Sequence, residues 1–463
     1  MTDSPLSRLS RRLPELVLKL DPADLEFYGR DWTRRWKPAP LAIAFPSNTG
    51  DVQEVVRWAV DEGIGIVPSG GRTGLSGGAV AANRELVISF ERMNRVLGFD
   101  PVDRIMTVQP GVILETLQRA ALEHGLIYPV DFGARGSCSI GGNIATNAGG
   151  IRVIRYGNTR EWIAGLKVVT GTGDLLDLNR GLIKNSSGYD LRHLMIGAEG
   201  TLGLVVEASV RLTDAPTESN VMVFAVPAME DLMQVFSVCR QKLNLSAFEF
   251  FTDLALAHVV AQGAQNPFEH VSPFYLITEF DAANEAQQAR AVEVFEQCFE
   301  KGWVNDGVIS QSSAQAASLW RLRDTITESL APLKPYKNDI SVRISVIPAF
   351  MQAMRAIFER EYPGYEVIWF GHIGDGNLHI NVIKPSDVSD ETFIVECERV
   401  TALLSETLAK FEGSISAEHG IGLVKKKYLR GTRSEAEIAM MRGIKRVLDP
   451  HGIMNPGKLF DLD

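Results

Sequence analysis

Glycine-rich segments alternate with short strand-like runs through the first half of this 463-residue chain, and this alternation restricts the folds open to it. "PSGGRTGLSGG" (68–78) follows an apolar run, and "GSCSIGGNIATNAGG" (136–150) and "GAEGTLGL" (197–204) repeat its composition. Glycine lets backbone N–H groups approach an anion or a flat ligand closely. The first segment lacks the GK[ST] of a P-loop and the GxGxxG that opens a Rossmann helix. Ligand-cradling loops and plain tight turns therefore both remain open.

The runs around these segments predict a mixed α/β domain. The strand-like runs are "GIGIVPSGG", "ELVISFERM", "RIMTVQPGV", "LKVVTGTGDLLDL" and "LGLVVEASVRL". Between them, "TGDVQEVVRWAVDEG" and "VILETLQRAALEHG" each begin after a polar or glycine residue and end at a glycine, as helices tend to. We place this domain at residues 38–215, after an N-terminal helical segment at 1–37.

The pattern changes after "TDAPTESN" (213–220), which is typical of a linker. "VMVFAVPAMEDLMQVFSVCRQ" and "VRISVIPAFMQAMRAIFEREY" each predict a strand, a proline turn and an amphipathic helix, and "PFYLITEFDAANEAQQARAVEVFEQ" predicts a strand and a helix. Such repetition favours a mainly antiparallel sheet with helices on one face. We expect this α+β domain at 216–425, and a C-terminal helix and Pro/Gly-rich tail at 426–463 that could join either domain.

Composition excludes several classes of protein. A hydrophobic content of 45% with 22% charged residues is ordinary for a globular protein. No apolar run reaches the ~20 residues of a membrane span, and the polar start lacks a secretory signal, so we expect a cytoplasmic protein without a transmembrane segment. The net charge of −10, without a long basic run, argues against nucleic-acid binding. The four cysteines are too scattered for a metal knuckle or an iron–sulfur cluster.

Histidines gather in "GHIGDGNLHINV" (371–382). If "NLHINV" is a strand, its alternation puts Asn377, His379 and Asn381 on one face, while His372 lies in the glycine-rich turn before it. The commoner fate of a lone histidine is a core or turn position bonded to backbone, and this interpretation stays open.

"SAEHGIG" (416–422) adds Glu418 and His419. His372, His379 and His419 are three of the chain's eight histidines, and they lie within 48 residues, each close to a glycine. Two imidazoles and a carboxylate with open positions suit a divalent ion such as zinc or manganese, so the spacing favours a metal site.

These motifs together resemble a known family. "PSGGRTGLSGG", "GSCSIGGNIATNAGG", "YGNTREWIAGLKVV", "NSSGYDL" and "GAEGTLG" are similar to the FAD-binding domain of the vanillyl-alcohol oxidase and p-cresol methylhydroxylase type. "GHIGDGNLHINV", "SAEHGIGLVKKKYL" and "NPGKLF" resemble its 2-hydroxy-acid dehydrogenase branch. The resemblance runs from about residue 38 to the end. It implies a two-part FAD-binding domain, an α+β substrate (cap) domain that carries the metal ligands, and a tail returning to the flavin site.

The resemblance also implies how FAD is bound. The first glycine-rich loop would wrap the pyrophosphate, and the second and third would run along the ribityl chain and the flavin. Some members bind FAD covalently through a loop histidine, and this first loop has none, so we expect noncovalent FAD. The residues expected to bind it are Pro68, Ser69, Gly70, Gly71, Arg72, Thr73, Gly74, Ser76, Gly77, Gly136, Ser137, Gly141, Gly142, Asn143, Thr146, Asn147, Gly149, Gly150, Glu199, Gly200, Gly203 and Asn455.

For the chemistry, the resemblance implies His372, His379 and Glu418 as metal ligands and His419 as general base. The expected activity is oxidation of a D-2-hydroxy acid to the 2-oxo acid by hydride transfer to flavin N5. A metal bound to the substrate carboxylate and hydroxyl lowers the hydroxyl pKa, and a neutral imidazole can take the proton. "DFGARGSCSIGGNIATNAGG", "LSAFEF" and "LWRLRDTITESL" most resemble the members of this branch that act on D-2-hydroxyglutarate, so the resemblance implies that substrate. The family implies an electron-transferring flavoprotein as acceptor and leaves room for a homodimer.

A second substrate carboxylate needs its own partners. In "LWRLRDTITESL", Arg323 and Thr327 are four apart and would share a helix face. Arginine offers a bidentate fork, and Lys337 adds a point charge. From the residues alone a solvated helical charge is favoured. The resemblance favours a clamp of Arg323, Thr327 and Lys337 with Asn381, and Arg321 would point elsewhere.

Other functions stay open. A D-lactate or glycolate dehydrogenase of the same family would keep the flavin and metal residues without needing the clamp. A metal-dependent hydrolase would use Glu418 or His419 to activate metal-bound water. A noncatalytic flavin-binding subunit is a third alternative, and the intact histidine and glutamate cluster argues against it.

Overall fold

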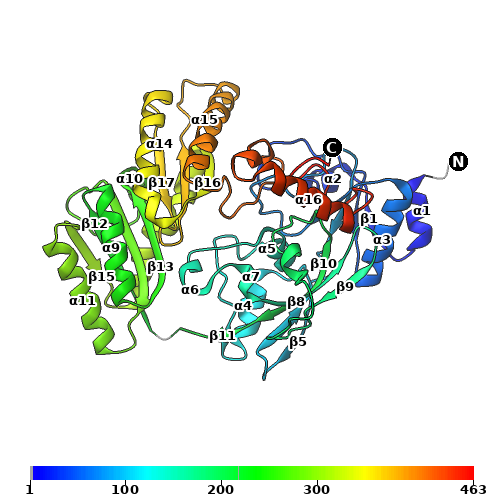
Figure 1. Cartoon of the computed structure of the whole chain (residues 1–463), viewed down its shortest axis with the longest axis horizontal. Coiled ribbons are helices and arrows are strands. Elements are labelled where there is room, and N and C mark those ends of the chain that lie inside the picture. The colour runs from blue at the N-terminus through cyan, green and yellow to red at the C-terminus, as the bar shows by residue number, and fades with distance from the viewer. Residues whose placement is uncertain (1–3, 217, 463) are drawn as a thin grey trace. The chain divides into compact units, whose positions relative to one another are not determined.

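The structure is a computed structural model that describes residues 4–216 and 218–462. The chain forms two compact units (Figure 1). The first contains Met1–Gly149, Gly157–Ala215 and Glu418–Asp463, and the second contains Gly150–Tyr156 and Pro216–Ala417. Two of the predicted limits therefore need correction, because the chain re-enters the first unit at Glu418 and not near residue 426, and because residues 150–156 belong to the second unit.

The first unit begins with a four-stranded sheet. Its order is β1 (Val17–Lys19), β2 (Ala42–Phe45), β4 (Leu86–Ser89), β3 (Ile66–Ser69). Strands β2, β4 and β3 are parallel, and α3 (Thr49–Glu62) connects β2 to β3. The segment at 1–37 was predicted to be helical. It does contain α1 (Pro5–Arg12) and α2 (Pro22–Tyr28), but β1 pairs antiparallel with β2, so the segment also extends the sheet.

A five-stranded antiparallel sheet forms the other part of the first unit. Its order is β5 (Val96–Asp100), β6 (Ile105–Val108), β10 (Leu204–Arg211), β8 (Ile163–Val169), β9 (Leu175–Leu178). The short strands β7 (Leu126–Ile127) and β11 (Thr213–Asp214) pair beside it. The helices of this part are α4 (Leu114–Leu122), α5 (Ile140–Thr146), α7 (Thr159–Trp162), α8 (Arg192–Met195) and the C-terminal α16 (Glu435–Leu448). The predicted strands are confirmed, and the two sheets make up the two-part domain.

The second unit is built on one seven-stranded sheet in which every described pairing is antiparallel. Its order is β15 (Asp306–Ile309), β12 (Ser219–Val226), β14 (Phe274–Asp281), β13 (Leu245–Thr252), β17 (Val367–Gly371), β18 (Asn377–Val382), β16 (Tyr336–Ser341). The antiparallel sheet predicted for the second domain is therefore confirmed.

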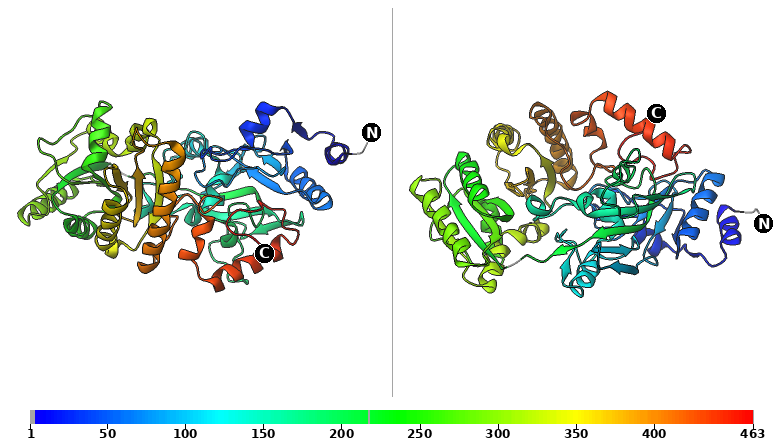
Figure 2. Two further views of the ribbon diagram at one scale, coloured as in Figure 1. Left: turned by 90° about the horizontal axis from the view of Figure 1, so that it is seen from above. Right: turned by 60° about the horizontal axis from the view of Figure 1, so that its bottom comes forward.

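Helices cover both faces of this sheet, whereas the sequence predicted one. One layer contains α9 (Met229–Lys242), α11 (Glu285–Glu300), α14 (Ile347–Glu361) and α15 (Asp390–Lys410). Helices α14 and α15 lie side by side (Figures 1 and 2). The opposite face packs on α6 (Val153–Tyr156), α10 (Asp253–Ala261), α12 (Ser313–Asp324) and α13 (Ile326–Leu330). Apolar residues are spread around α10 and α12, so no amphipathic stripe marked this second layer.

One predicted strand is wrong. The run "VRISV" before Pro348 is not a strand, because Ile344–Val346 form a 3₁₀ turn and α14 begins at Ile347. Proline is well placed in the first turn of a helix, where its missing N–H costs nothing. The strand of this region is β16, which lies earlier, at Tyr336–Ser341. Among the described residues, no helix combines the length and the apolar character that crossing a membrane requires.

Candidate functional site

The first two glycine-rich segments lie directly against each other. The first starts where the parallel strand β3 ends, at Ser69. A Cβ atom on Gly71 would lie 2.0 Å from the backbone oxygen of Ser137, and one on Gly70 would lie 2.2 Å from Ser139 Oγ. Real atoms do not approach so closely. Gly71 is therefore required by the packing of one loop on the backbone of the other, and not only by the approach of a ligand, whereas the Ser139 hydroxyl can rotate away from a Cβ on Gly70.

The residues around these loops fit a bound dinucleotide. Four non-glycine residues of the predicted FAD set have left-handed backbone, namely Arg72 (φ 58°), Asn147 (51°), Glu199 (51°) and Asn455 (42°). Strained backbone of this kind gathers at ligand sites. Ser69 Oγ and Asn455 Oδ1 are buried and have no hydrogen-bond partner among the described residues. Buried polar atoms need partners, so both suit contacts to a polar ligand.

Exposure varies across the rest of the predicted FAD set. Buried members are Ser76, Gly77, Asn143, Gly149, Gly150, Gly200 and Gly203. Half-buried members are Pro68, Gly70, Gly71, Thr73, Gly141, Gly142 and Thr146. Exposed members are Gly74, Gly136 and Ser137. Apart from Gly150, which belongs to the second unit, the whole set lies in the first unit.

Arg72 already has protein partners. Its guanidinium carbon lies 4.5 Å and 4.6 Å from the ring centres of Phe27 and Tyr28, and Nη2 lies 3.1 Å from Glu91 Oε1. Nη1 donates to the backbone oxygen of Gly70 at 3.0 Å. The side chain therefore fastens the first loop to α2, and its contact with FAD stays a prediction.

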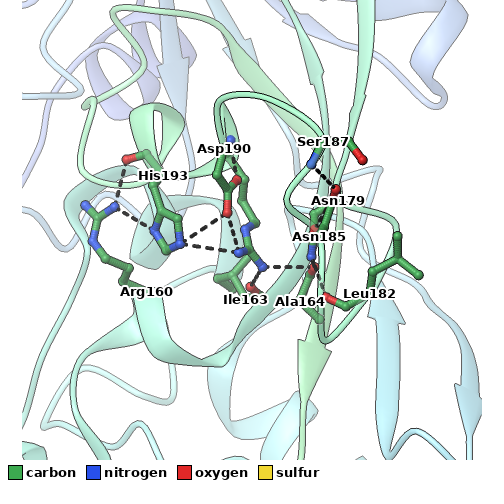
Figure 3. Close-up of polar contacts among 10 residues, drawn as sticks. Arg160, Ile163, Ala164, Asn179, Leu182, Asn185, Ser187, Asp190 and His193 are labelled. Carbon is green, nitrogen blue, oxygen red and sulfur yellow. Dashed lines mark hydrogen bonds and ion pairs between the residues drawn. The ribbon is translucent and has the colours of Figure 1, made fainter.

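Two arginines that the sequence did not single out, Arg160 and Arg192, bond to backbone oxygens in this region, and Figure 3 shows Arg160 beside His193. The Arg160 side chain donates to the backbone oxygens of His193 and Ile196, both at 2.7 Å, and its backbone N–H donates to Asn147 Oδ1 at 2.9 Å. Arg192 donates to the backbone oxygen of Ile163 at 2.7 Å. Arg160 lies in the motif "YGNTREWIAGLKVV" and Arg192 directly follows "NSSGYDL", but only the fold shows that they bond to backbone.

Glu199 holds the chain just beyond His419. Its carboxylate accepts hydrogen bonds from the backbone N–H groups of Ile421 at 2.7 Å and Gly422 at 2.8 Å. Burial raises the pKa of Glu199 to about 7, and the two N–H donors oppose the rise. The third glycine-rich segment therefore binds the segment that carries the predicted base, a contact across more than two hundred residues that spacing does not show.

The two histidines of the opening hairpin converge as predicted. His379 lies in β18 and His372 in the turn after β17, with ring centres 5.3 Å apart and planes inclined by 80°. Asp339 faces His379 in the β16–β18 register, with 3.7 Å between Asp339 Oδ1 and His379 Nδ1. Asn377 Nδ2 donates to Asp339 Oδ1 at 2.9 Å. Asp339 was missed, although the strand alternation of "PYKNDIS" placed it on the face of Lys337.

The chain reaches Glu418 from beside β16, because Ser414 pairs with Ser341, the last residue of that strand. One ligand atom from each of His372, His379 and Glu418 lies within 4.8 Å of the others, and Asp339, Glu418 and His419 form a second such group. Imidazole nitrogens with carboxylate oxygens are a donor set that zinc or manganese accepts. The residues present therefore fit a divalent metal.

The predicted Arg323 and Thr327 pair needs correction. Helix α12 ends at Asp324 and α13 begins at Ile326, so the two residues do not share one helix face. Thr327 is exposed, whereas Arg323 is buried and its Nη2 lies 2.9 Å from Glu249 Oε2. Arg321 is exposed, as expected.

Lys337 and Asn381 lie together on the histidine face of the sheet. Lys337 is the direct partner of Asn381 in the β16–β18 register, two positions from the Asp339 and His379 pair and therefore on the same face. Asn381 is buried, and burial lowers the pKa of Lys337. Among the described residues, no carboxylate forms an ion pair with this lysine. Its ammonium group is therefore available to an anion.

Comparison with known proteins shows similarity over the full length. Residues 40–179 match the family described as "FAD binding domain", and residues 215–459 match "FAD linked oxidases, C-terminal domain". A Xanthomonas citri pv. viticola protein named D-2-hydroxyglutarate dehydrogenase is 65% identical over 461 residues, covering 100% of this chain and 98% of that protein. A Stutzerimonas stutzeri protein of the same name is 52% identical over 462 residues, covering 99% of this chain and 100% of that protein.

Solved structures share the fold at low identity. A 4-ethylphenol oxidase from Gulosibacter chungangensis has a TM-score of 0.76 at 18% identity, with 98% of this chain and 96% of that chain covered. An alkyldihydroxyacetonephosphate synthase has a TM-score of 0.73 at 19% identity, with 97% of this chain and 84% of that chain covered. These matches agree with the two-domain fold, and at such identity they extend to the fold alone.

Proposed function

Because the chain belongs to the FAD-linked oxidase family, we propose that it oxidises D-2-hydroxyglutarate to 2-oxoglutarate by hydride transfer to bound FAD. Its full-length identity of 65% to a protein named for that reaction supports the substrate. The observation within this chain that carries the proposal is the shared sheet face of His379, Asn381 and Lys337. Neighbouring pairs on this face are two residues apart, about 7 Å along the strand, which suits a short chain with a carboxylate at each end.

FAD bound by the glycine-rich segments supplies the hydride acceptor. We propose that it is held noncovalently, since the first loop contains no histidine. Ser69 and Asn455 have buried oxygen atoms with no hydrogen-bond partner in the described part of the chain, and both are suited to hydrogen-bond it.

His372, His379 and Glu418 would hold a divalent cation, zinc or manganese, whose charge lowers the pKa of a substrate hydroxyl bound to it. His419, next to Glu418 in the chain, is proposed to remove the hydroxyl proton at a ring nitrogen as general base. Asp339 hydrogen-bonds Asn377 and faces His379, so it helps fix the orientation of that ring.

The far carboxylate is proposed to bind Lys337 and Asn381. Lys337 has no carboxylate partner among the described residues, so its charge is not already neutralised. Arg323 and Thr327 remain in the proposed substrate site but are proposed to contribute less to binding the far carboxylate, because Arg323 is paired with Glu249 and Thr327 is exposed. This weaker clamp is the observation that keeps a D-lactate or glycolate dehydrogenase as a second candidate. Electrons are proposed to leave to an electron-transferring flavoprotein.

Anaerobic mixing tests the proposal. The purified protein is mixed with D- and L-enantiomers of 2-hydroxyglutarate, malate and lactate while the flavin absorbance is followed. We expect D-2-hydroxyglutarate to bleach the flavin fastest and the L-enantiomers to leave it oxidised. Faster bleaching by D-lactate would favour the second candidate. Bleaching that survives exhaustive chelation would contradict the role of the metal.

A further inference from the structure

A charged side chain lies in the middle of the most buried strand of the second unit. All eight residues of β13 are buried, and Glu249 is 1% exposed. Its sheet neighbours on the same face, Ala247 and Phe251, belong to the apolar core. Burying a carboxylate among such residues costs several kcal/mol unless it is paired and hydrogen-bonded. Glu249 therefore has a role that an apolar residue at this position could not fill.

Both carboxylate oxygens of Glu249 have a partner. Oε1 lies 2.8 Å from His372 Nδ1, and Oε2 lies 2.9 Å from Arg323 Nη2. The Arg323 guanidinium also stacks over Phe370, with its carbon 5.0 Å from the ring centre. Arg323 is therefore a counter-charge held next to the buried carboxylate.

The contact with His372 determines which ring nitrogen can bind a metal. When Nδ1 carries the proton and donates it to Glu249, the lone pair of the neutral imidazole is on Nε2. Nε2 is then the ligand atom, and the hydrogen bond fixes the ring orientation. A carboxylate in this position also makes the imidazole a better electron donor to a cation.

A nearby glutamate shows what an ordinary buried ion pair looks like on this sheet. Glu279 lies on the adjacent strand and the same face, and it too is buried. It accepts hydrogen bonds from Arg152 Nε at 3.1 Å and from Trp320 Nε1 at 3.1 Å, where Glu249 has His372 and Arg323. Glu249 and Glu279 thus share burial and an arginine partner and differ in the contact with His372.

We infer that Glu249 is the positioning residue for the metal ligand His372, and that Arg323 serves this site by holding Glu249. The inference rests on the metal half of the proposed function. It gives Arg323 a task in addition to its proposed place in the substrate site, and it connects α12 to the metal ligand His372 through one ion pair and one hydrogen bond.

The experiment measures metal affinity directly. Glu249→Leu, Glu249→Gln and the control Glu279→Gln are purified with FAD, and their dissociation constants for Zn²⁺ and Mn²⁺ are obtained by competition with a chromogenic chelator. We expect Glu249→Leu to bind metal 10- to 100-fold more weakly than wild type. Glu249→Gln keeps an oxygen that can accept from Nδ1, so it should recover part of the loss. FAD content should not change, because the FAD segments lie almost wholly in the other unit.

Each outcome of the metal-affinity measurement supports or contradicts the inference. Should Glu249→Leu fail to fold, Glu249→Gln against Glu279→Gln still gives the comparison. Equal metal affinity in these two variants would overturn the inference while leaving the proposed function intact. A wild-type protein that binds neither cation would overturn the inference together with the metal half of the proposed function.

Arg323→Met separates its two possible tasks. If Arg323 acts through Glu249, this variant should lose metal affinity in the same direction as the Glu249 variants. If it acts only on the substrate, metal affinity should stay at the wild-type value while KM rises, and the assignment of Arg323 would be wrong.

Discussion

Replacing Glu199 with glutamine should change how the stability of the protein depends on pH. Burial raises the pKa of this carboxyl group to about 7 in the folded chain, against an ordinary value of 4.5. Between these two values the unfolded chain releases the proton and the folded chain keeps it. Stability is therefore lost as pH rises through this window, and the loss is complete above about pH 7.

The size of the change in stability follows from the folded and unfolded pKa values of Glu199. At about 1.4 kcal/mol per pH unit, the full window corresponds to about 3 kcal/mol. Most of it, about 2–3 kcal/mol, falls between pH 5 and pH 8. Glutamine does not titrate, and its NH₂ group would face one of the two N–H donors at Ile421 and Gly422, so its cost is the same at both pH values.

The assay is thermal unfolding of wild type and Glu199→Gln at pH 5 and pH 8. The difference between the two proteins cancels the titration of every other group. We expect the melting-temperature advantage of wild type to shrink by about 5–10 °C from pH 5 to pH 8, at ~2–4 °C per kcal/mol for a unit of this size. An equal advantage at both pH values would show that Glu199 titrates at the same pH in the folded and unfolded chain, and the reasoning from burial would be refuted.

Three other substitutions test the site. Lys337→Met should raise KM for D-2-hydroxyglutarate by a factor that corresponds to ~2–4 kcal/mol of binding free energy, with little effect on KM for D-lactate. Steady-state kinetics measures this with Arg321→Met as control, and an equal effect on both substrates would contradict it. His419→Ala should slow flavin reduction by ~10²–10⁴ while FAD and metal stay bound, measured by stopped-flow absorbance; loss of the metal instead would make His419 a ligand. Gly71→Ala should yield protein without FAD, because its Cβ would lie 2.0 Å from the Ser137 oxygen, and a yellow, stable variant would show that the two loops can separate.

The sequence predicted what depends on neighbours along the chain. Strand alternation placed Asn377, His379 and Asn381 on one face because β18 continues without a break over all three. The four-residue spacing of Arg323 and Thr327 failed for a local reason, since the helix breaks at Thr325, and no glycine or proline in "LWRLRDTITESL" marks such a break.

Contacts between distant residues could not be predicted in this way. His372 meets Glu249 over 123 residues, and no pattern in either stretch points to the other. The same holds for Gly71 and Ser137, which spacing alone interprets as parts of two separate ligand loops. The family resemblance supplied the predicted ligands and the predicted base, because it carries information on tertiary contacts, but not the residues proposed to hold them in place.

The placement of the proposed base is fixed mainly through backbone. Four successive N–H groups after His419 are engaged: those of Ile421 and Gly422 bind the Glu199 carboxylate, and those of Leu423 and Val424 bind the backbone oxygen of Ser76 at 2.8 and 3.0 Å. A Cβ on Gly422 would lie 2.1 Å from that same oxygen. Ser76 and Glu199 belong to two of the glycine-rich segments, so the segment that follows His419 is held by the residues expected to surround FAD. Side-chain changes at positions 421, 423 and 424 should therefore disturb the base less than a change at Glu199 or Gly422, even though neither Glu199 nor Gly422 takes part in the proton transfer.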